Sequence, residues 1–275
     1  TPRKARPRAS AMIFAILPNG ENDMNDYLPL LKRQLALDFN CSPEDFDKGE
    51  SVITESALNE GRRAYDADIP FFQMATLGKS AVISADKRLH PFLREYIRAE
   101  QGHWLFEQPR LFALEAELNK YSYTLNHSHH LFLYDKTSDT HGVIRKYPVK
   151  WFYGKEEIED FYGDSRFSNA LCAEYTPERP DTIAVCAYDG DKIMGMAGCS
   201  EDAPHWQQIG IDVLPEYRSM GVGSYLVNIL KDEIIRRGDI PFYGTGLANY
   251  HSWNIALKCG FRPVWVEMNA MKKQE

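Results

Sequence analysis

The chain has 275 residues, of which 44% are hydrophobic, and its net charge at pH 7 is −7. The apolar content is ample for a packed core, which excludes a disordered chain, and the length favours two domains. Four basic residues lie within the first ten positions, so the rest of the chain carries −11. That acidic balance argues against a nucleic-acid surface as the main function and favours a cationic or amine partner.

Neither a membrane span nor a disulfide framework is indicated. No apolar run reaches the roughly 18–20 residues that cross a bilayer, and the apolar run at 12–17 is too short for a signal peptide. Residues 1–11 are expected to be a tail or leader separate from the fold. The five cysteines are widely spaced without a C-x-x-C pair, which is typical of reduced thiols and predicts a cytoplasmic location.

The first half of the chain, residues 12–138, is predicted to be an α+β domain. An amphipathic helix is expected over 26–38, and Ser42 followed by Pro43 and two acids predicts a helix start. Downstream, the pattern predicts a hairpin and then two helices, with strands over 71–76 and 80–85 and helices over 86–101 and 108–120.

Three histidines lie within residues 127–130. A zinc site needs several ligands that converge in space, and no other His or Cys cluster has a matching spacing. We therefore expect a solvated turn at this point, with no metal bound.

A polar segment at 139–146 predicts the start of a second domain, which spans residues 139–275. A helix is expected first, followed by a β-hairpin with an Asp-Gly turn at 189–191. The expected helix covers 156–162 and the two strands of the hairpin cover 182–188 and 192–199.

Residues 207–231 carry the clearest local pattern in the chain. An alternating apolar run at 208–213 predicts a strand, Pro215 lies in the turn that follows, and the glycine-rich segment 218–224 then opens a helix. The first N–H groups of a helix have no intrahelical partner, and the helix dipole favours negative charge there. This turn therefore predicts an anion site, because glycine lets the backbone approach a phosphate closely.

The order of residues in this turn distinguishes it from two common phosphate-binding motifs. It reads Arg-x-x-Gly-x-Gly, so the third glycine of the dinucleotide fingerprint and the Gly-Lys-Ser/Thr end of a P-loop are both absent. The helix is expected to stop at Gly238, and Asn249 precedes a short helix that ends at Gly260. The flanking strands are expected over 240–245 and, as a closing strand or hairpin, over 262–272.

This succession resembles the acyl-CoA N-acyltransferases of the GNAT superfamily. The likeness covers residues 207–271 and rests on Arg-x-x-Gly-x-Gly at 218–223, with Asn249 eleven residues before Gly260. It implies an α/β (α+β) chain with a C-terminal GNAT fold, whose mixed, mostly antiparallel central sheet is flanked by helices. A looser likeness is to the two-domain GNAT acetyltransferase subgroup, and the N-terminal α+β domain is then either a degenerate GNAT-like copy or an unrelated cap.

The resemblance implies that acetyl-CoA is the cosubstrate and that no metal takes part. In the family, the amides of the turn hold the pyrophosphate of coenzyme A, and the main chain of the preceding strand pairs with pantetheine. Arg218 either contacts a phosphate or braces the turn, and Asn249 also suits a helix cap. The implied cofactor-binding residues are Ile211, Val213, Arg218, Ser219, Met220, Gly221, Val222, Gly223, Ser224 and Asn249.

The groups that move protons are marked less clearly. The tyrosine that the family often has in its last helix is replaced by Ala256, and the usual position of a base is Gln207, which cannot act as one. Asp212 is expected to be either the catalytic base or a structural acid, since a carboxylate in an apolar strand is costly unless paired. Other candidate bases are Glu201, Asp202 and His205. The candidate acids are Tyr250 and His251, with Tyr243 or water as alternatives.

The resemblance therefore implies that the protein is an N-acetyltransferase. It would transfer an acetyl group from acetyl-CoA to a primary amine of a small molecule or peptide by direct attack. A catalytically inactive CoA-binding regulatory module is the alternative, motivated by Ala256 and Gln207, and a structural protein without a ligand is a third option. No nucleic-acid or membrane partner is expected, and the sequence leaves open whether the chain forms a homodimer.

Overall fold

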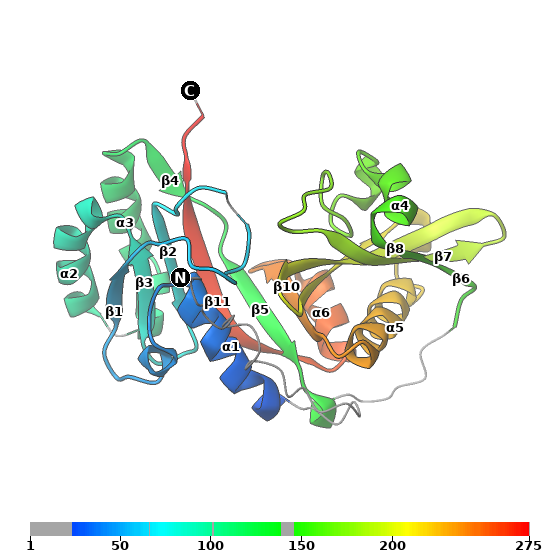
Figure 1. Ribbon diagram of the computed structural model, residues 1–275, viewed down its shortest axis with the longest axis horizontal. Coiled ribbons are helices and arrows are strands. Elements are labelled where there is room, and N and C mark those ends of the chain that lie inside the picture. Colours follow the sequence, from blue (N-terminus) through cyan, green and yellow to red (C-terminus); the bar gives the residue numbers. More distant parts are fainter. Residues whose placement is uncertain (1–23, 66, 101, 139–145, 275) are drawn as a thin grey trace, which may run out of the picture.

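The computed structural model describes residues 24–65, 67–100, 102–138 and 146–274 (Figure 1). The expected tail at 1–11 and the apolar run at 12–17 lie outside these ranges, as does all of the expected boundary segment except Lys146. The division into domains at 12–138 and 139–275 stays a prediction.

One connected sheet contains all the described strands, in the order β1-β3-β2-β11-β5-β10-β9-β8-β7-β6, with β4 paired to β11. Among the described pairs, β1–β3 and β9–β10 are parallel and the rest are antiparallel, which confirms the predicted mixed, mostly antiparallel sheet. The strands are β1 Val52–Glu55, β2 Phe72–Thr76, β3 Ala81–Ala85, β4 Tyr123–Leu125, β5 His129–Tyr134, β6 Val149–Tyr153, β7 Asp181–Asp189, β8 Lys192–Ala203, β9 Trp206–Val213, β10 Ile240–Gly246 and β11 Phe261–Lys272.

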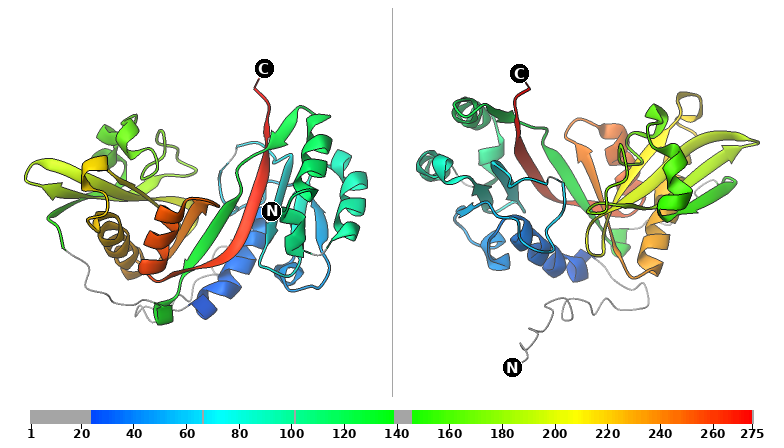
Figure 2. Two further views of the ribbon diagram at one scale, coloured as in Figure 1. Left: turned by 180° about the vertical axis from the view of Figure 1, so that it is seen from behind. Right: turned by 45° about the horizontal axis from the view of Figure 1, so that its top comes forward.

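Helices cover both faces of the sheet, as expected for an α/β protein. Figure 2 shows α2 and α3 at the N-terminal end of the sheet, with α5 and α6 beneath the strands of the second half. The α-helices are α1 Met24–Asp38, α2 His90–Ala99, α3 Arg110–Asn119, α4 Gly154–Ile158, α5 Val222–Arg236 and α6 Tyr250–Lys258.

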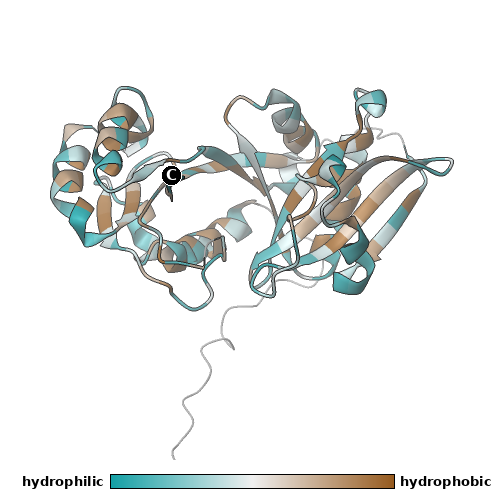
Figure 3. Cartoon of the chain, turned by 90° about the horizontal axis from the view of Figure 1, so that it is seen from above, coloured by the Kyte–Doolittle hydropathy of each residue, from teal (hydrophilic) through white to brown (hydrophobic). Residues whose placement is uncertain are grey.

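Apolar side chains point to alternate sides along the strands, which explains why helices pack on both faces of the sheet. Side chains of successive strand residues point to opposite sides of a sheet, and apolar and polar segments alternate along several strands in Figure 3. In β7, Ile183 and Val185 join the core that contains Leu226 of α5, whereas Ala184 joins a separate cluster with Ile158 of α4. The sheet therefore has a buried layer on each side.

The two halves of the chain exchange strands in the middle of the sheet. β5, which comes from the first half, lies between β10 and β11, where Leu133 pairs with Phe242 and Tyr134 pairs with Phe261. β11, from the second half, continues past β5 to pair with β2 and β4. Neither half closes its part of the sheet without a strand from the other.

Most local predictions in the second half are confirmed, and two in the first half are wrong. The second half of the expected turn at 127–130 is a strand, because His129 and His130 are the first two residues of β5. The strand includes them because the run that follows, Leu131–Tyr134, is buried between two neighbouring strands. The helix expected from Ser42 is a single 3-10 turn, Pro43–Phe46, because its cap is satisfied but no apolar periodic run follows. Strands β1, β4, β5 and β6 were not predicted.

Candidate active site

Strands β9 and β10 pair in parallel over only four residues and then diverge. The last pair joins Ile209 to Tyr243. Beyond it, among the described strands, β9 pairs with β8 alone and β10 with β5 alone. The facing edges of residues 210–213 and 244–246 are thus left without a strand partner, and such an edge can hydrogen-bond an extended ligand.

A cavity of about 1180 Å³ occupies this gap, and its walls come from β9, β10, the 218–224 turn and α6. Met220 is not among the lining residues, and its carbonyl instead accepts a hydrogen bond from the Tyr147 hydroxyl at 2.6 Å, which ties the turn to the segment before β6. The other predicted cofactor-binding residues all line the cavity, namely Ile211, Val213, Arg218, Ser219, Gly221, Val222, Gly223, Ser224 and Asn249.

The 218–224 turn has the backbone geometry of an anion site. Ser219 and Gly221 have left-handed backbones, with φ of 63° and 86°. α5 begins directly afterwards, so Val222 to Ser224 occupy its first three positions, where the N–H groups have no intrahelical partner. Together with the helix dipole, these groups favour a phosphate.

The two glycines of the turn serve different purposes. A Cβ at Gly221 would meet no described atom within 4 Å, but its left-handed φ is a conformation that glycine adopts at least cost. A Cβ at Gly223 would lie 2.9 Å from Cδ1 of Ile255 and 3.3 Å from Cγ2 of Val213. Gly221 therefore satisfies the conformation of the turn, and Gly223 allows α5 to pack closely on β9 and α6.

Residues 149–261 match the model of the acetyltransferase (GNAT) family. The matched segment contains both diverging strands, the glycine-rich turn and α6. This segment belongs to the GNAT superfamily. A search of the curated proteins found no match.

Several solved structures are similar to this chain at low identity. A GCN5-related N-acetyltransferase from Kribbella flavida is 13% identical with a TM-score of 0.43, over 78% of this chain and 91% of that one. An acetyltransferase from the GNAT family of Colwellia psychrerythraea is 12% identical, with a TM-score of 0.38 and 54% and 57% coverage. The yncA protein of Salmonella typhimurium, solved with its cofactor acetyl-CoA, is 14% identical, with a TM-score of 0.32 and 46% and 95% coverage.

Asp212 of the GNAT domain lines the cavity, but its carboxylate is already engaged by the loop before β7. It accepts hydrogen bonds from the backbone N–H and the side-chain amide of Asn169, both at 2.7 Å, and from the backbone N–H of Ala170 at 2.9 Å. The loop crosses β9 closely, since a Cβ at Gly210 would lie 1.9 Å from the Asn169 carbonyl oxygen. These contacts favour a positioning role for Asp212, and a catalytic role stays a prediction.

A tyrosine hydroxyl does reach α6, although the helix position itself is Ala256. Tyr243 of β10 and Ser252 of α6 share a hydrogen bond of 2.7 Å, and both residues line the cavity. Ser252 lies one helical turn before the buried Ala256, on the same face of the helix. Burial raises the pKa of the Tyr243 hydroxyl to about 12, so the group stays protonated.

The other predicted site residues are spread around the opening. Tyr250 is 72% exposed and does not line the cavity, whereas the exposed His251 does. Asn249 caps α6 by accepting a hydrogen bond from the Ser252 N–H at 3.2 Å. Arg218 Nε donates to the carbonyl of Val213 at 3.3 Å, so the bracing contact considered from the sequence is present.

A second cavity, of about 330 Å³, adjoins the first. The residues common to both are His129, Arg179, Gln208 and Gly244. Most of the remaining wall comes from α1, the segment between β1 and β2, and β11. The first half of the chain therefore contributes directly to the surroundings of the GNAT cleft.

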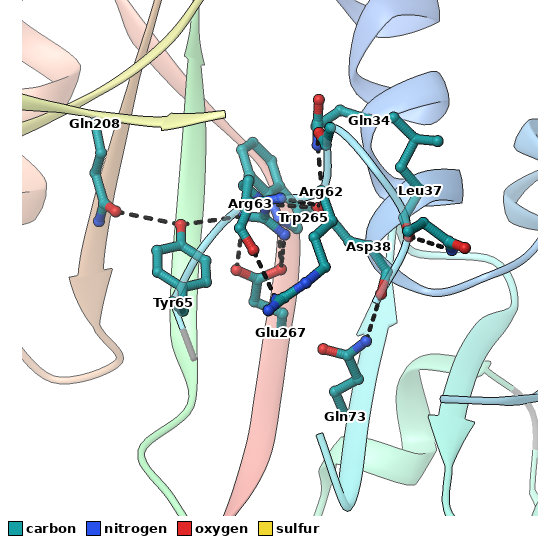
Figure 4. Close-up of polar contacts among 12 residues, drawn as sticks. Gln34, Leu37, Asp38, Arg62, Arg63, Tyr65, Gln73, Gln208, Trp265 and Glu267 are labelled. Carbon is teal, nitrogen blue, oxygen red and sulfur yellow. Dashed lines mark hydrogen bonds and ion pairs between the residues drawn. The ribbon is translucent and has the colours of Figure 1, made fainter. Parts of the chain in front are cut away.

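A buried ionic network holds this second wall together (Figure 4). The guanidinium of Arg63 donates to Asp38 at 2.6 Å and to the two carboxylate oxygens of Glu267 at 3.0 and 2.8 Å. Burial opposes the positive charge of Arg63, but the two carboxylates outweigh it and hold its pKa well above the ordinary value. Tyr65 extends the network by accepting from Arg63 at 3.3 Å and donating to Gln208 of β9 at 3.2 Å.

Sequence reasoning missed the residues that act across chain segments. Asn169 and Arg63 lie in irregular segments with no periodic pattern. Ser252 carried a usable signal, because it is four residues before the position where the family often has tyrosine. No cluster of three or more metal-ligating side chains occurs among the described residues, and no helix in those ranges combines the length and apolar character needed to cross a membrane.

Proposed function

We propose that the GNAT domain transfers an acetyl group from acetyl-CoA to a primary amine of a small molecule or peptide. The observation that carries this proposal is a single cavity that joins an unpaired strand edge to a glycine-rich helix start. An extended pantetheine arm suits the first and a pyrophosphate suits the second. Membership of the GNAT superfamily supports the use of coenzyme A.

The residues of the cleft suit the binding of the cosubstrate. The N–H groups of Val222 to Ser224 would hold the pyrophosphate, and the open edge of residues 210–213 would pair with the pantetheine arm. A backbone N–H of that edge would also polarise the carbonyl oxygen. Acetyl-CoA supplies an acetyl group activated as a thioester.

Direct attack on the thioester needs proton transfers at both ends of the reaction. The amine forms a C–N bond to the carbonyl carbon, the C–S bond breaks, the nitrogen loses a proton and the departing sulfur gains one. We assign the second transfer to the Tyr243–Ser252 pair: the Ser252 hydroxyl would give its proton to the sulfur while it takes the proton of Tyr243 through their hydrogen bond, and solvent would then reprotonate Tyr243. No covalent enzyme intermediate is needed, which agrees with the burial of Cys259.

An amine panel tests the function. The protein is incubated with acetyl-CoA and, in separate reactions, ethanolamine, putrescine, lysine or a lysine-containing peptide. The release of CoA thiol and the mass of the product are then measured. We expect stoichiometric CoA and N-acetylated product with at least one amine. A rise in unfolding temperature with acetyl-CoA but no turnover with any amine would favour the inactive CoA-binding module instead.

Replacing Ser252 with alanine is expected to lower kcat about 100-fold. This is the low end of the range for the loss of a general acid, because a thiolate whose thiol has an ordinary pKa can leave without being protonated first. The acetyl-CoA dissociation constant, measured by calorimetry, should change little. Tyr243→Phe should lower kcat as well. The double variant should lose less than the sum of the two, since the hydroxyls act as a pair. Wild-type kcat in S252A would refute the assignment.

A further inference from the structure

His129 stands where the two cavities meet. In the sheet it lies opposite Gly246 of β10 on one side and opposite Glu267 of β11 on the other. Its side chain is exposed and lines both the GNAT cleft and the second cavity. The next residue, His130, points to the other face, where its ring packs edge-on against Trp253 with the ring centroids 4.9 Å apart.

The part of β10 that lies beside His129 and Leu131 carries no side chain on the face of His129. Residues opposite each other in an antiparallel pair share a face of the sheet, and the partners of Leu131 and His129 are Gly244 and Gly246. A Cβ at Gly246 would meet no described atom within 4 Å, so packing does not require glycine there. The imidazole can therefore reach over β10 toward the unpaired strand edges.

The acidic groups that face His129 are already engaged. On β11, Glu267 accepts from Arg63 and from the indole N–H of Trp265 at 3.2 Å. Asp38 of α1 accepts from Arg63, and Asp212 of β9 accepts from the 169–170 backbone. The remaining ionisable neighbours that line the second cavity are Arg62, Tyr65, His127 and Arg179.

The imidazole of His129, in contrast, makes no hydrogen bond or ion pair with the part of the chain that the structure describes. Imidazole is also the side chain best suited to exchange a proton near neutral pH. Proton removal from an attacking amine requires a base that is free to accept a proton and that faces the gap between β9 and β10, where the reaction would take place.

We propose that His129 is the proton acceptor of the GNAT reaction and that the acceptor amine approaches through the second cavity. This inference rests on the proposed acetyl transfer. The amine nitrogen attacks the thioester carbon with its lone pair, and one N–H proton passes to the unprotonated nitrogen of the imidazole. The proton on the departing sulfur comes from Tyr243 through Ser252. His129 then releases its proton to solvent and Tyr243 regains one, so the amide and CoA thiol are the only products. The catalytic base thus comes from the half of the chain outside the matched family segment.

His129→Gln in the full-length chain tests the role directly, with ethanolamine as the probe amine. We expect kcat/KM for ethanolamine to fall about 100-fold or more, the usual effect of losing a general base. The dissociation constant for acetyl-CoA should stay within about twofold. His103→Gln, an exposed histidine elsewhere in the first half, is the matched control and should be fully active. In His129→Gly, added imidazole should restore part of the lost rate, which a purely structural role would not allow.

Gly246→Val gives an independent test that leaves the histidine in place. The new side chain would stand between His129 and the cleft without a clash, because no described atom lies within 4 Å of its Cβ. Valine also suits a strand, so the unfolding temperature should not fall. We expect turnover to drop as in H129Q. Wild-type kcat/KM in both H129Q and G246V would overturn the proposal.

A binding readout separates failure of this inference from failure of the proposed function. In protein labelled with ¹³C-histidine, the His129 signal should shift more with acetyl-CoA than with CoA, because only the former places an acetyl group at the junction. If the protein acetylates ethanolamine but the His129 signal does not shift, the placement of His129 is refuted and the proposed function is not. A protein that neither binds acetyl-CoA nor turns over would refute the proposed function and, with it, the role of His129.

Discussion

Replacing Gly221 with glutamate should raise the dissociation constant for acetyl-CoA by at least about 100-fold. The new carboxylate would enter the space expected for the pyrophosphate, and two like charges about 4 Å apart at the protein surface repel by roughly 4 kcal/mol at most. Because each 1.4 kcal/mol is a factor of about ten in affinity, a loss of 100-fold or more follows even if the charges relax apart. Isothermal titration calorimetry with acetyl-CoA measures the effect.

Gly238→Glu is the matched control for this variant. Gly238 follows the other end of α5, has a left-handed φ of 83° and offers a Cβ the same open surroundings. Both variants add the same charge, and both place a non-glycine residue in a left-handed conformation at a cost of about 1–2 kcal/mol. The unfolding temperature of both variants should therefore fall. Only Gly221→Glu should lose acetyl-CoA. If G221E binds as tightly as G238E, the phosphate is not held at this turn.

A fragment that begins at residue 146 should fail to fold. Without β5, the strands β10 and β11 lose their common neighbour. The four buried side chains of Leu131–Tyr134 would be missing, each worth roughly 1.5–3 kcal/mol when fully buried. That sum is comparable to the whole stability of a typical domain, about 5–15 kcal/mol. We expect insoluble expression or a circular dichroism melt without a cooperative transition.

The same fragment with β5 restored provides the comparison. Residues 127–136 can be joined after residue 274 through a flexible linker of about ten residues, which spans a gap of about 15–20 Å. β5 would then lie antiparallel to β11, as in the intact chain. Recovery of soluble protein that binds acetyl-CoA would show that strand loss is the cause. A fragment that folds cooperatively without this addition would show that the exchanged strand is dispensable.

The parts of the GNAT cleft that the sequence predicted are those with local signals. A strand, a turn with two glycines and an amphipathic helix follow one another within residues 207–236, and each has its own pattern. The first helical N–H groups bind anions wherever such a helix begins, so the 218–224 turn could be located without knowledge of the tertiary fold.

The rest of the site depends on contacts between distant segments. The bonds from Asn169 to Asp212 and from Arg63 to Glu267 join irregular loops to strands, and no periodicity marks such pairs. The sequence predicts a solvated turn around His129, because the residues next to it are polar and the apolar run of the strand begins only after it. Its importance depends on β5 lying beside β10, which is a matter of strand pairing and cannot be deduced from a single sequence.

The exchange of β5 and β11 also constrains how the protein can be synthesised. β2 and β5 each need β11 as a neighbour, so Met74, which pairs with Ile83 of β3 on one side, gains its β11 partner only after Met268 has left the ribosome. Until then a nascent chain exposes unpaired strand edges, which are templates for association with other chains. The first half therefore cannot finish folding during translation ahead of the second, as independent domains do. We expect pauses late in synthesis to be more harmful to this chain than pauses near its middle, and its folding in the cell to depend on chaperones that shield those edges.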